Sequence, residues 1–301
     1  MAARILSTAD GTNRGSFTAV DWALFASIAS IWGSSFLLID IGLDAFEPGL
    51  VTFVRVGLGA VVLALVPRAR RPVARADWPR VVALSVTWVA LPFTLFPLAQ
   101  QHINSAVTGM LNGATPVFTA FVATFMLRRL PRGSQLVGLA VGFAGVAAIS
   151  LASGSEGRTQ LLGVVLVLGA TAMYGLSINI SAPITQRYGS LPVMARMLAL
   201  ATLWTAPFGI VDGAASSFAW DAAVAVGFAG AVGTGAAFVI MGTLVGRVGS
   251  TRGSFITYFI PVVALVLGVV FRGDEVTPVG ILGIVLVLIG AALASRREAA
   301  R

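Results

Sequence analysis

Residues 105–121 read SAVTGMLNGATPVFTAF, and residues 135–148 read QLVGLAVGFAGVAA. The same pattern returns 145 residues later, as STRGSFITYFIPVVALV over 250–266 and GILGIVLVLIGAAL over 280–293. Small residues and one proline coincide at this offset: Ser105 and Ser250, Pro116 and Pro261, Gly138 and Gly283, Gly145 and Gly290, and Ala147 and Ala292. An internal repeat in an apolar chain is typical of secondary transporters.

The composition indicates that lipid solvates most of the chain. Of the 301 residues, 57% are hydrophobic and only 11% are charged, and the mean hydropathy is +0.93. A soluble domain of this length would carry about 25% charged residues. The chain is therefore predicted to be an all-α integral membrane protein.

Charge and residue usage exclude several classes of function. The net charge is +8, but all twenty basic residues are arginines, and most lie in short loops, so membrane topology explains them better than nucleic-acid binding. The absence of cysteine excludes disulfides and thiolate metal sites. A single histidine, His102, excludes a histidine metal cluster. We expect no catalytic residue, metal site or cofactor, and no enzymatic activity.

Apolar stretches of about 20 residues can cross a bilayer as helices. Ten such stretches are predicted, at 18–40, 48–66, 80–100, 104–127, 134–151, 160–181, 191–211, 221–243, 251–271 and 277–295. A cytoplasmic arm (1–17) and a cytoplasmic tail (296–301) flank them.

The arginines predict how the two copies are oriented. Sixteen of the twenty lie on the side of the N-terminus and two on the other side, which places both termini in the cytoplasm. Five spans per copy is an odd number, so the copies at 18–151 and 160–295 are predicted to be inverted. Such 5+5 inverted repeats hold substrate near the midplane, at their interface.

Several motifs resemble the EamA-like family of the drug/metabolite transporter superfamily. They include WGSSF at 32–36, FVRVGLGA at 53–60 and the repeated block described above, whose second copy ends in Gly-Asp-Glu at 273–275. The resemblance covers about residues 18–295. It implies export of small metabolites from the cytoplasm across a bacterial inner membrane, with amino acids, aromatic ones included, as a prominent substrate class.

Aromatic residues at mid-membrane depth are candidates for a central cavity, because Trp and Tyr normally lie at the membrane interfaces. Trp32 aligns with Tyr174 at an offset of 142. We predict that these two, with Trp88 and Tyr258, line the cavity and stack on an apolar or planar substrate. The alternative is packing between helices, with one satisfied hydrogen bond each.

Polar residues on one helical face are the second set of candidates. Thr108, Asn112 and Thr115 are spaced four and three apart, and Asn112 aligns with Thr257 of the second copy. The alternative is an interhelical hydrogen bond, worth about 0.6 kcal/mol. The predicted substrate-binding residues are, together, Trp32, Ser35, Trp88, Thr108, Asn112, Thr115, Tyr174, Asn179, Ser254, Thr257 and Tyr258.

Prolines within spans are candidates for hinges, because each removes a helical hydrogen bond. Pro92, Pro116 and Pro261 are predicted to kink their helices. Two arginines within spans, Arg55 and Arg196, are read as structural, with anion binding as the alternative. The repeated glycines suit close helix packing, either inside one chain or in a homodimer.

The expected partners are the lipid bilayer and a small-molecule substrate, with no nucleic acid. Because no carboxylate is expected deep inside a span, we predict facilitated diffusion, with coupling through another route as the alternative. Alternative cargoes are nucleosides, sugars and drugs. A non-transporting membrane scaffold is the alternative of another class.

Overall fold

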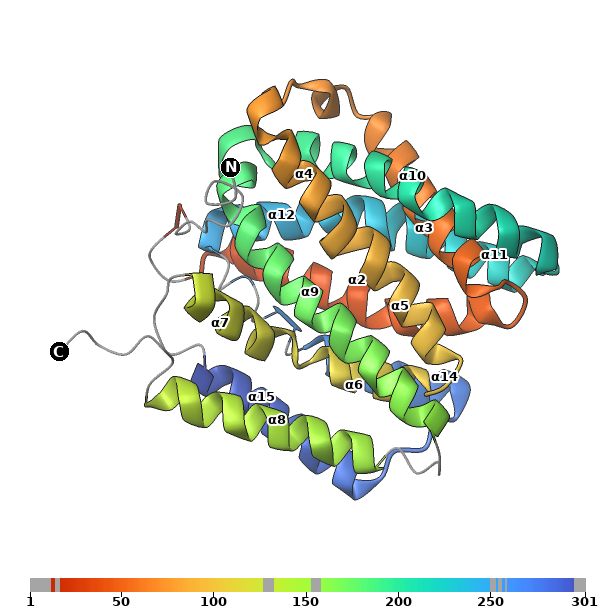
Figure 1. Ribbon diagram of the computed structural model, residues 1–301, viewed down its shortest axis with the longest axis vertical. Coiled ribbons are helices and arrows are strands. Elements are labelled where there is room, and N and C mark those ends of the chain that lie inside the picture. Colours follow the sequence, from red (N-terminus) through yellow and green to blue (C-terminus); the bar gives the residue numbers. More distant parts are fainter. Residues whose placement is uncertain are drawn as a thin grey trace.

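The structure, a computed structural model, describes residues 12–13, 17–126, 133–152, 158–249, 253, 256–257 and 259–294. Helices account for its regular elements (Figure 1). The first copy contains α2 (Ala19–Leu43), α3 (Pro48–Ala64), η1 (Pro67–Arg70), η2 (Arg75–Asp77), α4 (Trp78–Leu84), η3 (Ser85–Ala90), α5 (Leu91–Gln100), α6 (Ser105–Asn112), α7 (Thr115–Met126) and α8 (Ser134–Ala152). The second contains α9 (Arg158–Tyr188), α10 (Ser190–Ala215), α11 (Trp220–Gly230), η4 (Ala231–Ala236), α12 (Ala237–Val248), α14 (Ile260–Arg272) and α15 (Pro278–Ala294).

Five helical stretches are long and apolar enough to cross a membrane: Ala19–Leu43, Arg75–Gln100, Gln160–Tyr188, Ser190–Ala215 and Trp220–Val248. Shorter apolar helices lie at Pro48–Ala64, Leu136–Ile149, Ile260–Arg272 and Pro278–Gly290. Large apolar side chains such as Phe125 and Val211 are 80% and 70% exposed. A surface of this kind suits contact with lipid.

Prolines and π-helical turns interrupt the long helices. Pro116 and Pro261 each stand at the second position of a helix that begins in mid-stretch, α7 or α14, where a missing N–H costs nothing. Pro92 has the same position in α5, directly after the π-helical η3. The three prolines that the sequence predicted to kink their helices therefore lie in the first turns of α5, α7 and α14.

The last helices of the two copies, α8 and α15, lie side by side (Figure 1). A Cβ built on Gly145 would lie 2.6 Å from the carbonyl oxygen of Gly283, and one built on Gly290 would lie 2.6 Å from that of Gly138. The repeat relates these two contacts to each other, because Gly145 corresponds to Gly290 and Gly138 corresponds to Gly283. Residue numbers rise along α8 while they fall along α15, so the two helices are antiparallel.

Two other pairs from corresponding places in the copies show the same antiparallel order. Between α3 and α10, Gly49 lies against Asp212 and Gly209 against Phe53. Between α6 and α14, backbones approach at three steps in opposite sequence order: Gly109 meets Ala264, Gly113 meets Pro261, and Gly268 meets Ser105.

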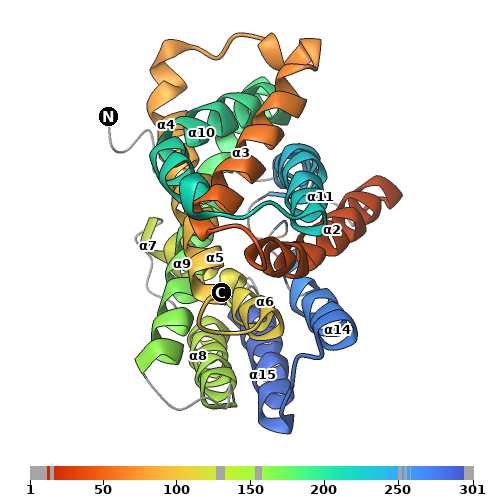
Figure 2. The same ribbon diagram turned by 90° about the vertical axis from the view of Figure 1, so that its right-hand side faces the viewer.

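The first helix of each copy lies among helices of the other copy. Helix α2 packs against α11, α12 and α14, and α9 packs against α5 and α7 (Figures 1 and 2). Both first helices thereby reach the centre of the molecule. The buried apolar residues form two clusters, and Trp32 and Tyr174 pack against both.

Candidate functional site

A small cavity lies where the two copies meet. It is lined by Trp32, Ser35, Phe36, Ile39, Arg55, Phe93, Phe96, Asn112, Tyr174 and Ile260. The first eight belong to the first copy and the last two to the second. The centre of a water molecule can reach about 30 Å³ of it. One water needs about 10–15 Å³ by this measure, so the cavity has room for a few waters.

Arg55 is the charged residue of the lining. Its side chain is buried, with the residue only 5% exposed, and its guanidinium lies 4.3 Å from the centre of the Phe93 ring. In the part of the chain that the structure describes, no carboxylate forms an ion pair with it. A buried cation is costly unless it is paired or hydrogen-bonded.

Two hydroxyl oxygens hold the Arg55 guanidinium in place. Nε donates to Thr234 Oγ1 at 3.1 Å, and Nη2 donates to Ser35 Oγ at 3.2 Å. Each hydroxyl donates its own proton to a backbone carbonyl, Ser35 to Ile31 at 3.2 Å and Thr234 to Ala229 at 3.0 Å. Both oxygens are therefore left as acceptors that face the cation.

The π-helical η4 supplies contacts to the cavity from the second copy. It carries Thr234, and its Gly233 carbonyl accepts the indole N–H of Trp32 at 3.1 Å. Segments of π-helix are rare and occur frequently at functional sites. Here η4 joins α2 and α3 to the second copy through one carbonyl and one hydroxyl.

Aromatic rings form much of the wall. Tyr174 and Phe96 lie tilted at 5.6 Å between ring centres, and Phe36 meets Phe96 edge-on at 5.4 Å. Trp32 meets Phe238 edge-on at 5.6 Å. The aligned pair Trp32 and Tyr174 thus lies in the wall of one cavity.

Asn112 is the amide of the lining. It is 3% exposed, and its Oδ1 accepts from Thr115 Oγ1 at 3.3 Å. Its Nδ2 makes no hydrogen bond to the residues that the structure describes. The cavity therefore presents N–H donors from both Arg55 and Asn112.

The remaining predicted binding residues lie away from the lining. Trp88 is 1% exposed and meets Phe238 edge-on at 5.3 Å. Thr108 and Thr115 donate to carbonyls of their own chain segment, Asn104 and Asn112, at 2.9 and 2.8 Å.

Two further predicted residues are buried away from the lining, and two lie outside the described residues. Asn179 donates to the carbonyl of Thr119 at 3.0 Å, tying α9 to α7, and Thr257 is 2% exposed. Ser254 and Tyr258 lie outside the described residues.

Phe36, Phe93 and Phe96 line the cavity but were not predicted. The chain has eighteen phenylalanines, and the sequence does not show which of them face the centre of the molecule. Arg55 was interpreted as structural, although a cation within a span indicates a functional site. The aligned Arg196 differs from it. Arg196 Nη1 donates to the carbonyls of Ala69 and Pro192, at 3.0 and 2.9 Å.

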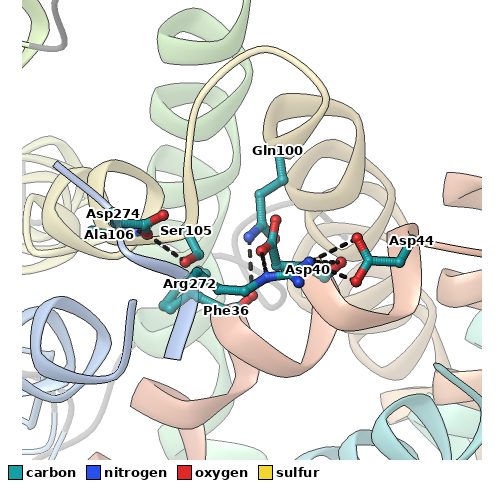
Figure 3. Close-up of polar contacts among 8 residues, drawn as sticks. All are labelled: Phe36, Asp40, Asp44, Gln100, Ser105, Ala106, Arg272 and Asp274. Atoms are coloured by element: carbon teal, nitrogen blue, oxygen red, sulfur yellow. Dashed lines mark hydrogen bonds and ion pairs between the residues drawn. The ribbon is translucent and has the colours of Figure 1, made fainter. Parts of the chain in front are cut away.

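Charged clusters tie both ends of α2 to the second copy. At its C-terminal end, Arg272 Nε bonds Asp40 at 2.5 Å, and Nη2 bonds both carboxylate oxygens of Asp44 at 2.8 Å (Figure 3). These three residues are called the Arg272 cluster. Beside it, Asp274 accepts from the Ser105 hydroxyl at 2.8 Å and fixes the start of α6.

At the N-terminal end of α2, Asp21 is fully buried and accepts from Arg247 Nε at 2.6 Å. It also accepts from the Thr18 hydroxyl at 2.7 Å and from Asn13 at 2.9 Å. These four residues are called the Asp21 cluster. Asp21 and Asp40 both belong to α2 and lie near its two ends rather than at its middle.

The EamA-like transporter family matches residues 20–151 and 161–296, one match for each copy. The chain belongs to this family. It is a multi-pass membrane transporter of small molecules and not an enzyme.

Relatives named as exporters cover almost the whole chain. It is 28% identical over 285 residues to a probable terminal-alkyne amino-acid exporter of Streptantibioticus cattleyicolor, covering 93% of this chain and 94% of the relative. It is 23% identical to a probable amino-acid metabolite efflux pump of Escherichia coli, covering 90% and 93%. A crystal structure with 18% identity shares the fold, with a TM-score of 0.65 over 92% of this chain and 97% of that one.

Proposed function

We propose that this transporter exports neutral or aromatic amino acids by alternating access around the central cavity. The cavity between the two copies is the observation that carries the proposal. Its aromatic wall suits a planar or apolar side chain, and Arg55 and Asn112 offer donors to a polar head group. The names of the relatives support the same substrate class.

We further propose a topology of ten spans as a 5+5 inverted repeat, with both termini cytoplasmic. The antiparallel packing of α8 with α15 and of α3 with α10 supports inversion of the copies. The arginine distribution supports the orientation. In this arrangement the Arg272 cluster closes the outer side and the Asp21 cluster closes the cytoplasmic side. Each facing state opens one of them.

Uniport is the proposed mode of transport. No carboxylate lines the cavity in the part of the chain that the structure describes, and the two acids of α2, Asp21 and Asp40, are paired with arginines near its ends. Proton-coupled carriers commonly keep a carboxylate or a histidine on the substrate path. Equal rates of efflux with and without an imposed proton gradient are therefore expected.

The test is efflux from proteoliposomes loaded with amino acids, nucleosides, sugars and organic acids, read by mass spectrometry. Selective loss of neutral or aromatic amino acids supports the proposal. Loss of another class alone would replace the substrate, and no loss under any gradient would favour a scaffold. For any variant of the cavity wall in this assay, Trp88→Phe is the matched control, because Trp88 lies in the aromatic core and not on the cavity wall.

A further inference from the structure

We infer that Arg55 is the residue that binds the carboxylate group of the substrate, so that this transporter selects for carboxylates. The inference rests on the proposed function and names the chemistry of its site. It starts from the buried guanidinium in the cavity wall, 5% exposed and without a carboxylate partner among the described residues.

The surroundings of Arg55 hold the cation but do not neutralise it. Thr234 and Ser35 supply neutral oxygens, at 3.1 and 3.2 Å, and Phe93 supplies a ring face. These contacts occupy Nε and Nη2, and Nη1 makes no hydrogen bond to the residues that the structure describes. A guanidinium offers five N–H donors in a planar fork that matches a carboxylate.

The position of the cation favours an anion that arrives with the substrate. Arg55 is held from α2 and from η4, and therefore from both copies, which fixes its direction before a substrate binds. Asn112 adds a second donor in the same cavity. A carboxylate bound there would gain charge-assisted hydrogen bonds at a site that excludes most water.

The cavity offers weaker interactions to an amino group than to a carboxylate. No carboxylate lines it among the described residues, and an ammonium would meet only neutral groups there, such as the Asn112 amide oxygen and the Tyr174 hydroxyl and ring face. The carboxylate is therefore the group that the site requires, and the ammonium is dispensable.

The test compares ligands that differ in one group. Phenylalanine carries both groups, 3-phenylpropionate lacks the ammonium, and phenylalaninamide lacks the carboxylate. Binding to the purified full-length protein is followed by tryptophan fluorescence, since Trp32 lies in the cavity wall. The wild type is expected to bind the two carboxylates about tenfold or more tightly than the amide.

Variants separate recognition from folding. Arg55→Met should abolish the preference for carboxylates, and Arg55→Lys should retain part of it, because it keeps the charge without the fork. Arg196→Gln is the matched control, since Arg196 bonds only carbonyls. A purely structural Arg55 would lower stability but leave the ratio of affinities unchanged, which would overturn the inference. Equal binding of amide and carboxylate by the wild type would overturn it as well.

Efflux of the same three compounds separates this inference from the proposed function. If the amide is exported as fast as phenylalanine, export stands and the role of Arg55 falls. The other outcome is that no compound is exported, although the wild type binds the carboxylates and the Arg55→Met variant does not. In that case the binding site stands and the export proposal falls.

Discussion

Trp32 donates its indole N–H to the carbonyl oxygen of Gly233, 201 residues away in sequence, at 3.1 Å. The bond fastens the first helix of one copy to the π-helical turn of the other, beside the cavity. Trp32→Phe keeps a ring but leaves this carbonyl without its donor. We expect a loss of about 1–3 kcal/mol in stability and weaker substrate binding. Thermal unfolding in detergent measures the first, with Trp22→Phe as control, because the Trp22 residue is 55% exposed.

The Arg272 cluster is expected to keep the outer side closed. The natural chain has no cysteine, so Ile39→Cys places a single thiol in the cavity wall. Adding Arg272→Gln removes the bonds to Asp40 and Asp44 and should speed labelling by a membrane-impermeant maleimide from outside about threefold or more.

Arg187→Gln is the matched control for that labelling experiment. It breaks the 2.8 Å ion pair with Asp77, on the proposed cytoplasmic side. External labelling that rises equally in both variants would mean that the Arg272 cluster does not act as a gate.

Close packing at Gly145 predicts opposite effects for two like substitutions. Gly145→Ala forces a Cβ against the backbone of α15, and we expect a loss of about 1–3 kcal/mol. Gly227 has no atom within 4 Å of a built Cβ, so Gly227→Ala should be neutral or gain about 0.5–1 kcal/mol. Unfolding midpoints compare them, and equal losses would contradict the close contact.

The Asp21 cluster should behave as one coupled unit. Asp21 is fully buried, whereas the Arg247 side chain is 36% exposed. Asp21→Asn and Arg247→Gln should each destabilise the protein, and the double variant by less than their sum, with a coupling of about 1–3 kcal/mol. Strict additivity in this double-mutant cycle would show that the ion pair contributes little.

Much of the fold follows from the repeat, because apolar length and glycine spacing are local properties of the chain. The sequence placed Gly145 and Gly290 at equivalent positions, and the structure brings their helices together. Span length was harder to predict. The stretch 104–127 is interrupted at Gly113 and Ala114, and α3 has only 17 residues.

The site was predicted in part because sequence shows which residues are unusual but not where they point. Trp32, Ser35, Asn112 and Tyr174 line the cavity, whereas Trp88 turns into the aromatic core. A hydroxyl on an apolar helix has a carbonyl acceptor one turn away, and Thr108 uses it.

Thr234 could not be predicted, since its contact with Arg55 depends on the π-helical turn η4. The extra residue in that turn changes the direction of the side chains that follow, and the Thr234 hydroxyl lies 3.1 Å from Arg55 Nε. No periodic pattern in the sequence records such a turn.

The cavity between the two copies has room for only a few waters. A carrier that changes its facing state around a cavity of this size moves almost no solvent and almost no dissolved ion with it. The return step of the transport cycle then moves no charge across the membrane except the charges of the protein itself. An exporter built in this way could cycle in an energised membrane without dissipating the gradients that the cell maintains across it.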